Sequence, residues 1–374
     1  MGGKAETKLV YLERLQSGIS RRQAGRGFVY KDAAGKRIKD PAVLDRINAL
    51  GIPPAYRDVV ISEDPSSHLQ ATGIDTRGRK QYLYHPEWRA MRDQAKFERL
   101  LPFATVLPDI RQRVDGDLRK QRIGMEKAVA TVVWMLDNLF IRIGNVDYVR
   151  TNGSYGLTTL RNRHVNVDGS RIRFRFRGKS GKEWNLVHTD RRIANVVRRL
   201  QDLPGQSLFQ YLDDDGSRRP VSSHDVNSYI REISGEDFTS RQFRTWGATC
   251  MAVAALAPVE VADSERMVSR QINEAVDAVA AKLVNTRTVC RSNYIHPSVI
   301  EAFRAGTLGN VLTLPKTRSR KLLDWMTQDE IRTLQWLKSR SMSSTQPEPK
   351  GSQDRSLCDD SPCEGAVNAT MLSK

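Results

Sequence analysis

Five residues whose side chains suit the chemistry of a phosphodiester lie beyond the first third of this 374-residue chain: Arg142, Lys179, Arg244, Asn285 and Tyr294. When a hydroxyl attacks a phosphodiester, charge develops on the non-bridging oxygens, and two arginines suit that charge because guanidinium is always charged and bonds in a bidentate way. A lysine among cations has a lowered pKa and can protonate the leaving alkoxide. A carboxamide can donate to an oxygen, and a tyrosine can attack as a nucleophile.

Taken singly, each of these residues also has an ordinary interpretation. The polar four fit solvated surface groups or simple phosphate contacts. Tyr294 stands in "VCRSNYIHPSVIEAF", just before a helix that we expect to begin near Pro297 and to stop at Gly306. A tyrosine at such a boundary fits a half-buried packing residue with its hydroxyl in water. Composition and spacing do not bring the five together in space.

The elements that must position these residues divide the chain into three parts. Residues 1–98 read as a β-rich domain, because short alternating stretches are separated by turn signals such as Asp-Pro-Ser-Ser and Asp-Thr-Arg-Gly. Residues 99–340 read as a mainly helical domain with a small antiparallel sheet, which makes the fold class α+β. We expect residues 341–374 to be disordered, because Ser, Pro, Gln, Gly and Asp dominate there.

The small sheet is predicted from two turns and one alternating strand. Asp168-Gly169 is a strong hairpin signal, and Gly178 to Lys182 forms a second turn that carries Lys179. In "RIRFRFR" the apolar residues alternate with arginines, so we expect an apolar face in the core and a basic face outside. The outward arginines that we expect to follow DNA phosphates are Arg173, Arg175 and Arg177. Near the C-terminal end, Thr327 and Glu330 have the spacing of a capping box that starts a last helix.

Charge gives the strongest compositional signal. The chain has 60 Lys and Arg against 43 Asp and Glu, a net charge of +17, which points to a polyanionic partner, and nucleic acid is the first candidate. No apolar run reaches the length of a membrane span, and "MGGKAETKLVYLERL" lacks the apolar core of a signal peptide. Four cysteines make no disulfide framework in a chain this long, so we expect a reducing, cytoplasmic setting and no metal site.

Several of these segments together resemble type IB DNA topoisomerases of the small poxvirus-like and bacterial kind, over roughly residues 20 to 335. They are "GRKQYLYH", "RIGNVDYVRTNGSYGLTTLRNRHV", "FRGKSGKEW", "FRTWGAT" and "NTRTVCRSNYIHPSV", in that order. The resemblance implies that Arg142 and Arg244 are the catalytic arginines, Lys179 the general acid and Tyr294 the nucleophile. It also implies a monomer that closes around double-stranded DNA as a C-shaped clamp and relaxes supercoils through a 3′-phosphotyrosyl link. Neither ATP, a metal nor another cofactor would be needed, and the enzyme would act on the nucleoid in the cytoplasm.

The same resemblance marks DNA-contact residues outside the catalytic set. In "RGRKQYLYH" the basic residues are interleaved with aromatic ones, a pattern that suits a strand lying in or across a DNA groove. The expected contacts are Arg79, Lys80, Gln81, Tyr82 and Tyr84, with Tyr148 as a further contact near the cleavage site. The alternative for the first five is an exposed antiparallel strand with one packed face.

One position departs from the poxvirus pattern, which has histidine nine residues before the tyrosine where this chain has Asn285. Asparagine can donate a hydrogen bond but carries no charge, so we expect weaker stabilisation there and not loss of activity. A tyrosine recombinase is the closest rival, but it typically carries histidine where this chain has Arg241, and its N-terminal domain is helical. A non-catalytic DNA-binding protein is the second rival. His296 invites a role as a base, yet we expect it to hold the Tyr294 loop.

Overall fold

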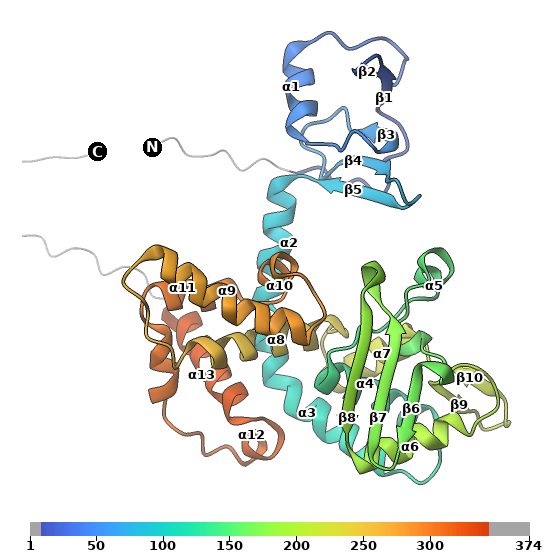
Figure 1. Ribbon diagram of the computed structural model, residues 1–374, viewed down its shortest axis with the longest axis vertical. Helices are drawn as coiled ribbons and strands as arrows, with labels where there is room; N and C mark the ends of the chain where they lie inside the picture. The colour runs from blue at the N-terminus through green and yellow to red at the C-terminus, as the bar shows by residue number, and fades with distance from the viewer. Residues whose placement is uncertain (1–8, 344–374) are drawn as a thin grey trace, which may run out of the picture.

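The structure is a computed structural model that describes residues 9–343 of the chain (Figure 1). Most of the tail that we expect to be disordered, including Cys358 and Cys363, lies outside these residues. In the described part the chain is a mixture of helices and small antiparallel sheets, with a β-rich region at the N-terminal end. The α+β fold class expected from the sequence is therefore confirmed.

The N-terminal part is a five-stranded antiparallel sheet in the order β2-β1-β3-β4-β5. Its strands are β1 (Ile19–Ala24), β2 (Gly27–Lys31), β3 (Arg57–Ile61), β4 (Leu69–Ile74) and β5 (Lys80–Tyr84). One helix, α1 (Pro41–Ala49), was not predicted; Asp40 caps its start by accepting from the backbone N–H of Ala42. The sheet and α1 share a small core of their own, which includes Ile19, Ile47 and Ile61.

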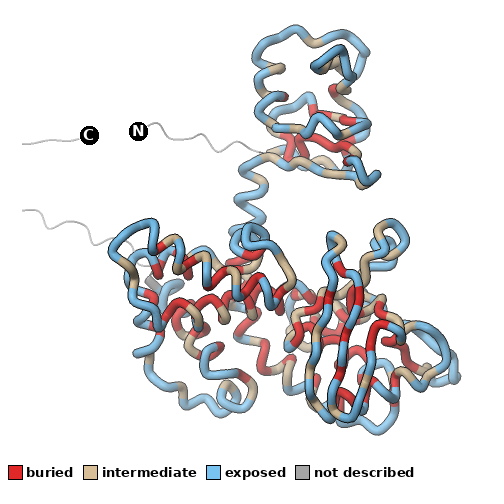
Figure 2. The backbone as a smooth tube through the Cα atoms, viewed as in Figure 1, coloured by how far each residue is buried: buried red, intermediate tan, exposed pale blue. Residues whose placement is uncertain are grey.

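Two consecutive helices lead out of this sheet. Helix α2 (Pro86–Glu98) begins directly after β5, and α3 (Leu100–Arg119) follows it after a single residue, Arg99. The domain boundary that the sequence places between residues 98 and 99 stays a prediction; Arg99 is the single residue between the two helices. Figure 2 shows buried residues gathered in two separate groups, with an exposed stretch of α2 between them.

The rest of the described chain forms a larger, mainly helical part around the second core. Its helices are α4 (Met125–Leu139), α5 (Val146–Asn152), α6 (Arg191–Gln201), α7 (Ser223–Ser234), α8 (Arg241–Leu256), α9 (Glu265–Lys282), α10 (Arg287–Asn293), α11 (Pro297–Arg304), α12 (Arg320–Trp325) and α13 (Gln328–Ser343). Short 3₁₀ turns lie at 157–159, 162–164, 179–181 and 308–313. The capping box predicted at Thr327 and Glu330 is confirmed, since Thr327 N–H donates to Glu330 at 2.9 Å.

The sheet of this part is three-stranded, in the order β6-β7-β8, with strands β6 (Val165–Asp168), β7 (Arg171–Arg177) and β8 (Glu183–Thr189). A separate pair joins β9 (Gln210–Leu212) to β10 (Arg218–Pro220). The two predicted turns are confirmed: Gly169 has a φ of 55° between β6 and β7, and Lys179 lies in the turn between β7 and β8. The predicted alternation is confirmed as well, with the arginines of β7 exposed and Ile172, Phe174 and Phe176 buried.

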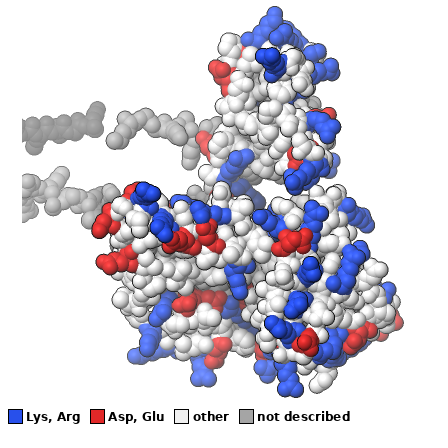
Figure 3. All heavy atoms as spheres, viewed as in Figure 1, with Lys and Arg blue, Asp and Glu red and all other residues white. Residues whose placement is uncertain are grey.

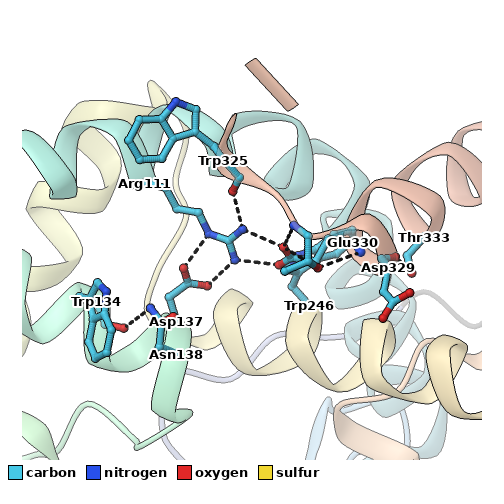
Figure 4. Close-up of polar contacts among 10 residues, drawn as sticks. Arg111, Trp134, Asp137, Asn138, Trp246, Trp325, Asp329, Glu330 and Thr333 are labelled. Carbon is cyan, nitrogen blue, oxygen red and sulfur yellow. Dashed lines mark hydrogen bonds and ion pairs between the residues drawn. The ribbon is translucent and has the colours of Figure 1, made fainter. Parts of the chain in front are cut away.

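A buried ion network ties four helices of this part together (Figure 4). Arg111 of α3 donates to Asp137 of α4 at 2.7 Å and to Glu330 of α13 at 2.7 Å. Glu330 also accepts from the indole N–H of Trp246 in α8 at 3.0 Å. Burial opposes ionisation of Glu330, but hydrogen bonds from Arg111 and the positive charge of that residue outweigh burial and lower the pKa of the carboxyl. Helix α8, which carries Arg244, is thereby fastened to its neighbours.

Candidate active site

Arg142 lies three residues after Leu139, the last residue of α4. The helix stops at Leu139 because Phe140 takes a left-handed conformation, with φ at 54°. The chain then runs against a second loop, in which Leu157 N–H donates to the Arg142 carbonyl at 2.9 Å. A side chain at Gly156 would place its Cβ only 2.6 Å from the Arg142 carbonyl oxygen, so glycine is needed for this close approach. Arg142 is thus positioned by its backbone, while its side chain stays half-buried.

Arg244 enters the same region from the first turn of α8 and is only 3% exposed. Its guanidinium donates to the backbone carbonyls of Phe140 and of Leu283, the latter at 2.9 Å. These bonds fix the plane of the guanidinium between the end of α4 and the end of α9. Burial, together with the charge of Arg142, lowers the pKa of Arg244 to about 10. The group is therefore charged at neutral pH, in a setting where an anion would be strongly attracted.

Tyr294 closes the cluster from a third direction. It forms the C-cap of α10, a short helix that was not predicted, and its N–H donates to the Cys290 carbonyl at 3.0 Å. The tyrosine ring lies 4.9 Å from the Arg244 guanidinium carbon. Thr249 of α8 donates to the Tyr294 carbonyl at 3.2 Å and accepts from His296 N–H at 3.2 Å. One buried hydroxyl thus holds the backbone on both sides of Ile295.

Asn285 follows the end of α9 and joins the cluster through Arg142, whose guanidinium donates to the Asn285 carboxamide oxygen at 2.6 Å. The carboxamide nitrogen of Asn285 and Nε of Arg244 are both buried without a hydrogen-bond acceptor. Among the residues that the structure describes, these are the two buried side-chain nitrogens that have no hydrogen-bond partner. Buried donors without partners are rare and costly, so a missing acceptor is the natural explanation for this pair. The oxygens of a phosphate would supply it.

Lys179 lies at the exposed tip of the β7–β8 hairpin. Although the residue is exposed, desolvation beside the cluster lowers the pKa of its amine, and the charges of Arg142, Arg241 and Arg244 lower it further, while Tyr294 raises it. A turn with Ser180 at φ 61° and Gly181 at φ 75° brings the lysine to this place. A lysine with a lowered pKa is a better proton donor at neutral pH than an ordinary one.

Electrostatics at Tyr294 favour its deprotonated form. Burial raises the pKa of the phenol, but the charges of Arg244 and Arg142 and their hydrogen bonds outweigh burial and lower the pKa below its usual value of about 10. The five residues predicted from the sequence are therefore brought together, from the ends of α4, α9 and α10, the start of α8 and one hairpin tip.

The predicted DNA-contact residues lie on elements on either side of the gap between the two parts of the molecule. Figure 1 shows β5 and the tip of the β7–β8 hairpin, with α5 beside it, on opposite sides of the gap between the two parts. On β5, Lys80, Tyr82 and Tyr84 are exposed on one face, and the two tyrosine rings stack at 6.4 Å. On the other side, Tyr148 of α5 is 59% exposed, and Arg173, Arg175 and Arg177 are exposed along β7. Figure 3 shows Lys and Arg side chains on both margins of this gap.

Two of the predicted contact residues have partners within the protein. Arg79 forms an ion pair with Asp75 at 2.7 Å, and the amide nitrogen of Gln81 donates to the same carboxylate at 3.0 Å. The Arg79 side chain and backbone N–H groups lower the pKa of Asp75 to about 2. Asp75 thereby holds the turn that precedes β5.

Sequence reasoning missed three residues around Tyr294: Thr249, Arg241 and Phe97. Thr249 gave little signal, because a small polar residue in "WGATCMAVAALA" looks like part of a buried helix. Arg241 was noted only as the position where recombinases differ.

His296, expected to hold the loop, accepts from Ser298 N–H at 3.2 Å and packs against the Phe97 ring, with a centroid distance of 5.3 Å. Burial lowers the pKa of His296 to about 4, so the imidazole is neutral at physiological pH.

A half-buried tyrosine beside two arginines, with a lysine close enough for their charges to interact in a strongly basic chain, is the arrangement expected of an enzyme that breaks and rejoins the phosphodiester backbone of DNA. Family comparison agrees. Residues 85–308 match the family described as eukaryotic DNA topoisomerase I, catalytic core, and residues 27–75 match the bacterial DNA topoisomerase IB, N-terminal domain. The chain belongs to the type IB DNA topoisomerases.

Individual relatives agree with this assignment. The chain is 30% identical over 299 residues to DNA topoisomerase 1B of Acanthamoeba polyphaga mimivirus, covering 78% of this chain and 89% of the relative. It is 25% identical over 293 residues to DNA topoisomerase 1 of rabbit fibroma virus, covering 74% and 89%. DNA topoisomerase 1B of vaccinia virus, strain Copenhagen, is 27% identical over 209 residues, covering 50% of this chain and 65% of the relative. No helix of residues 9–343 is long and apolar enough to cross a membrane.

Proposed function

We propose that this topoisomerase relaxes supercoiled duplex DNA by cutting one strand through Tyr294 and rejoining it. The observation that carries the proposal is the pair of buried donors without acceptors, on Arg244 and Asn285, beside a tyrosine whose pKa is lowered. A backbone phosphate placed there would accept from both donors and from Arg142. Such donors stabilise the charge that develops on the non-bridging oxygens in the transition state.

The proposed reaction has two symmetric steps. The Tyr294 oxygen attacks phosphorus, the bond from phosphorus to the 5′ oxygen breaks, and Lys179 gives a proton to that leaving oxygen. A 3′-phosphotyrosyl link remains, and the free strand rotates about its intact partner. The 5′ hydroxyl then attacks the link, returns its proton toward Lys179 and releases Tyr294. Because one phosphoester is exchanged for another, the ester is conserved in the protein link, and neither ATP nor a metal ion enters the balance.

The DNA is proposed to lie between the β5 surface and the β7–β8 hairpin. Lys80, Tyr82 and Tyr84 would contact it from one side, and Tyr148, Arg173, Arg175 and Arg177 from the other, with Arg79 and Gln81 bordering the first surface. The exposed basic side chains on both margins support this path. We further propose that the protein works as a monomer on the nucleoid in a reducing cytoplasm, in keeping with the unpaired thiols of Cys250 and Cys290.

Relaxation of a supercoiled plasmid in EDTA without nucleotide tests the proposal, with Tyr294→Phe as the comparison. We expect the wild type to relax the plasmid and to leave a covalent adduct after denaturation with detergent, while the variant binds DNA without doing either. Relaxation by both proteins would show that the nucleophile is elsewhere. Binding without relaxation by both would favour a recombinase or a plain DNA-binding protein.

A further inference from the structure

Helix α2 connects the predicted DNA surface to the nucleophile segment through packed contacts at both of its ends. At its start, His85 caps the helix and donates its N–H to the His68 carbonyl at 2.8 Å. Trp88 packs edge-on against the His68 ring at 4.7 Å, and the ring of His68 lies 5.9 Å from that of Tyr84, the last residue of β5. The first turn of α2 is therefore held by His68, whose ring also lies near that of Tyr84 on β5.

The other end of α2 contacts the chain on both sides of Tyr294. Lys96 Nζ donates to the Ser292 carbonyl, two residues before the tyrosine, at 3.4 Å. The Phe97 ring packs against the His296 ring, two residues after it, at a centroid distance of 5.3 Å and an interplanar angle of 61°. Phe97 is 6% exposed, and the ammonium of Lys96 lies 4.4 Å from the centre of its ring. The two contacts lie on either side of Tyr294 in the sequence.

Between these ends α2 crosses solvent. Every residue from Arg89 to Ala95 is exposed, as the pale blue stretch in Figure 2 shows. A helix of 13 residues is about 20 Å long and is marginal in water on its own, so its order depends on its packed ends and on pairs such as Lys96 with Asp93. While both ends stay packed and the helix stays intact, a shift at one end is carried to the other.

We propose that Phe97 and Lys96 are positioning residues for Tyr294, and that α2 links occupation of the β5 surface by duplex DNA to the alignment of the nucleophile. This inference rests on the proposed function, in which Tyr294 attacks and β5 contacts DNA. His296, the partner of Phe97, is joined through Thr249 to the Tyr294 carbonyl, so a shift of the Phe97 ring moves the tyrosine backbone. The ring of Tyr294 then moves relative to Arg142 and Arg244.

The test compares Phe97→Leu with Phe97→Tyr, which keeps the ring, and with Phe209→Leu, which removes a buried ring from another part of the core. Three quantities are measured in the full chain: DNA affinity, the rate of covalent adduct formation at saturating enzyme, and the dependence of that rate on pH. We expect Phe97→Leu to bind DNA normally and to form adduct about tenfold more slowly, since even small misplacement of a reacting group slows chemistry strongly. Its pH–rate profile should move to higher pH, because Tyr294 loses the influence of its arginines.

The controls separate positioning from simple loss of stability. Phe97→Tyr should restore the rate and the profile, whereas Phe209→Leu should lower the melting temperature and leave both unchanged. If Phe97→Leu lowers the melting temperature in the same way but keeps the wild-type rate and profile, the inference is overturned. A change in DNA affinity alone would overturn it too, since α2 would then only hold the two parts together.

Loosening the middle of α2 provides a second variant that touches neither contact. Ala90→Gly with Ala95→Gly weakens the helix at two exposed positions, and we expect slower adduct formation with unchanged DNA affinity. A wild-type rate in this double variant would overturn the role of α2 as a link. Failure of the proposed function would give a different result from failure of this inference: the wild type would form no adduct, or Tyr294→Phe would still form one.

Discussion

Lys179 and Tyr294 have opposite requirements for their protons, and both pKa values are shifted downward. In the proposed reaction Tyr294 attacks when deprotonated, so adduct formation should rise with pH through a pKa below the usual tyrosine value. Lys179 must be protonated to act as an acid, so the rate should fall as pH rises through a pKa below the usual lysine value. The residue pair therefore predicts a bell-shaped profile for single-turnover cleavage.

A sulfur leaving group isolates the role of Lys179. Replacing the 5′ bridging oxygen of the DNA with sulfur gives a thiolate leaving group, which needs no proton because thiols have a pKa of about 8.5. We expect Lys179→Ala to slow cleavage of ordinary DNA by about 10²- to 10⁴-fold and to cleave the sulfur substrate at nearly the wild-type rate. Equal losses on both substrates would show that the lysine only binds phosphate. Lys182→Ala, in the same turn, is the matched control.

Asn285 can be tested by separating its two hydrogen-bonding roles. Asn285→Asp keeps an oxygen that accepts from Arg142 but removes the buried donor, and Asn285→Ala removes both. We expect Asn285→Ala to slow cleavage by about 10²-fold, the usual cost of losing one oxyanion donor. Asn285→Asp should be slower still, because a negative charge then faces the phosphate. A fast Asn285→Asp variant would mean that the carboxamide serves only to hold Arg142.

At the scale of elements, the network of Arg111, Asp137, Glu330 and Trp246 fastens the helix that carries Arg244. We expect Glu330→Gln to lower the free energy of unfolding by about 3 kcal/mol, because it leaves the half-buried Arg111 without part of its compensation. Urea denaturation measures this change. Glu274→Gln, which breaks an exposed pair with Arg270, should cost less than about 1 kcal/mol. Equal effects of the two changes would contradict a structural role for the buried network.

Sequence reasoning predicted elements well where the signal was local. Asp168-Gly169, the alternation of β7, and the capping box of Thr327 and Glu330 are each visible within a few residues. Helices α1 and α10 were missed, since they are short and their apolar periodicity is weak. The catalytic set was predicted from family resemblance and not from spacing: only the tertiary fold brings Arg142 to Asn285, and no local pattern encodes the bond from Thr249 to the Tyr294 backbone. The contact of Phe97 with His296 joins residues 199 positions apart in the sequence, so no local pattern predicts it.

At the scale of the whole molecule, basic side chains on either side of the gap predict a strong dependence of binding on salt. Each lost phosphate contact should reduce the slope of log K against log salt by about one. We expect this result for Lys80→Ala on β5 and for Arg177→Ala on β7, measured by titration at several salt concentrations. Arg320→Ala, on an exposed residue of α12, should leave the slope unchanged. Unchanged slopes in the first two variants would place the DNA elsewhere.

The scatter of the site along the chain also bears on how the protein is made. The proposed cleavage needs groups supplied from position 142 through position 294, whereas the basic strand β5 ends at Tyr84. A chain emerging from the ribosome therefore completes its predicted DNA-contacting strand long before the nucleophile has been synthesised. Asn285 and Tyr294 are the last of the five predicted catalytic residues to be synthesised, and each contacts residues made earlier: Arg142 for Asn285, and Arg244 and Thr249 for Tyr294. If β5 contacts DNA as proposed, an incomplete copy that ends before Tyr294 has the DNA-contacting strand but lacks the proposed nucleophile, so it has no means of cutting DNA through that residue.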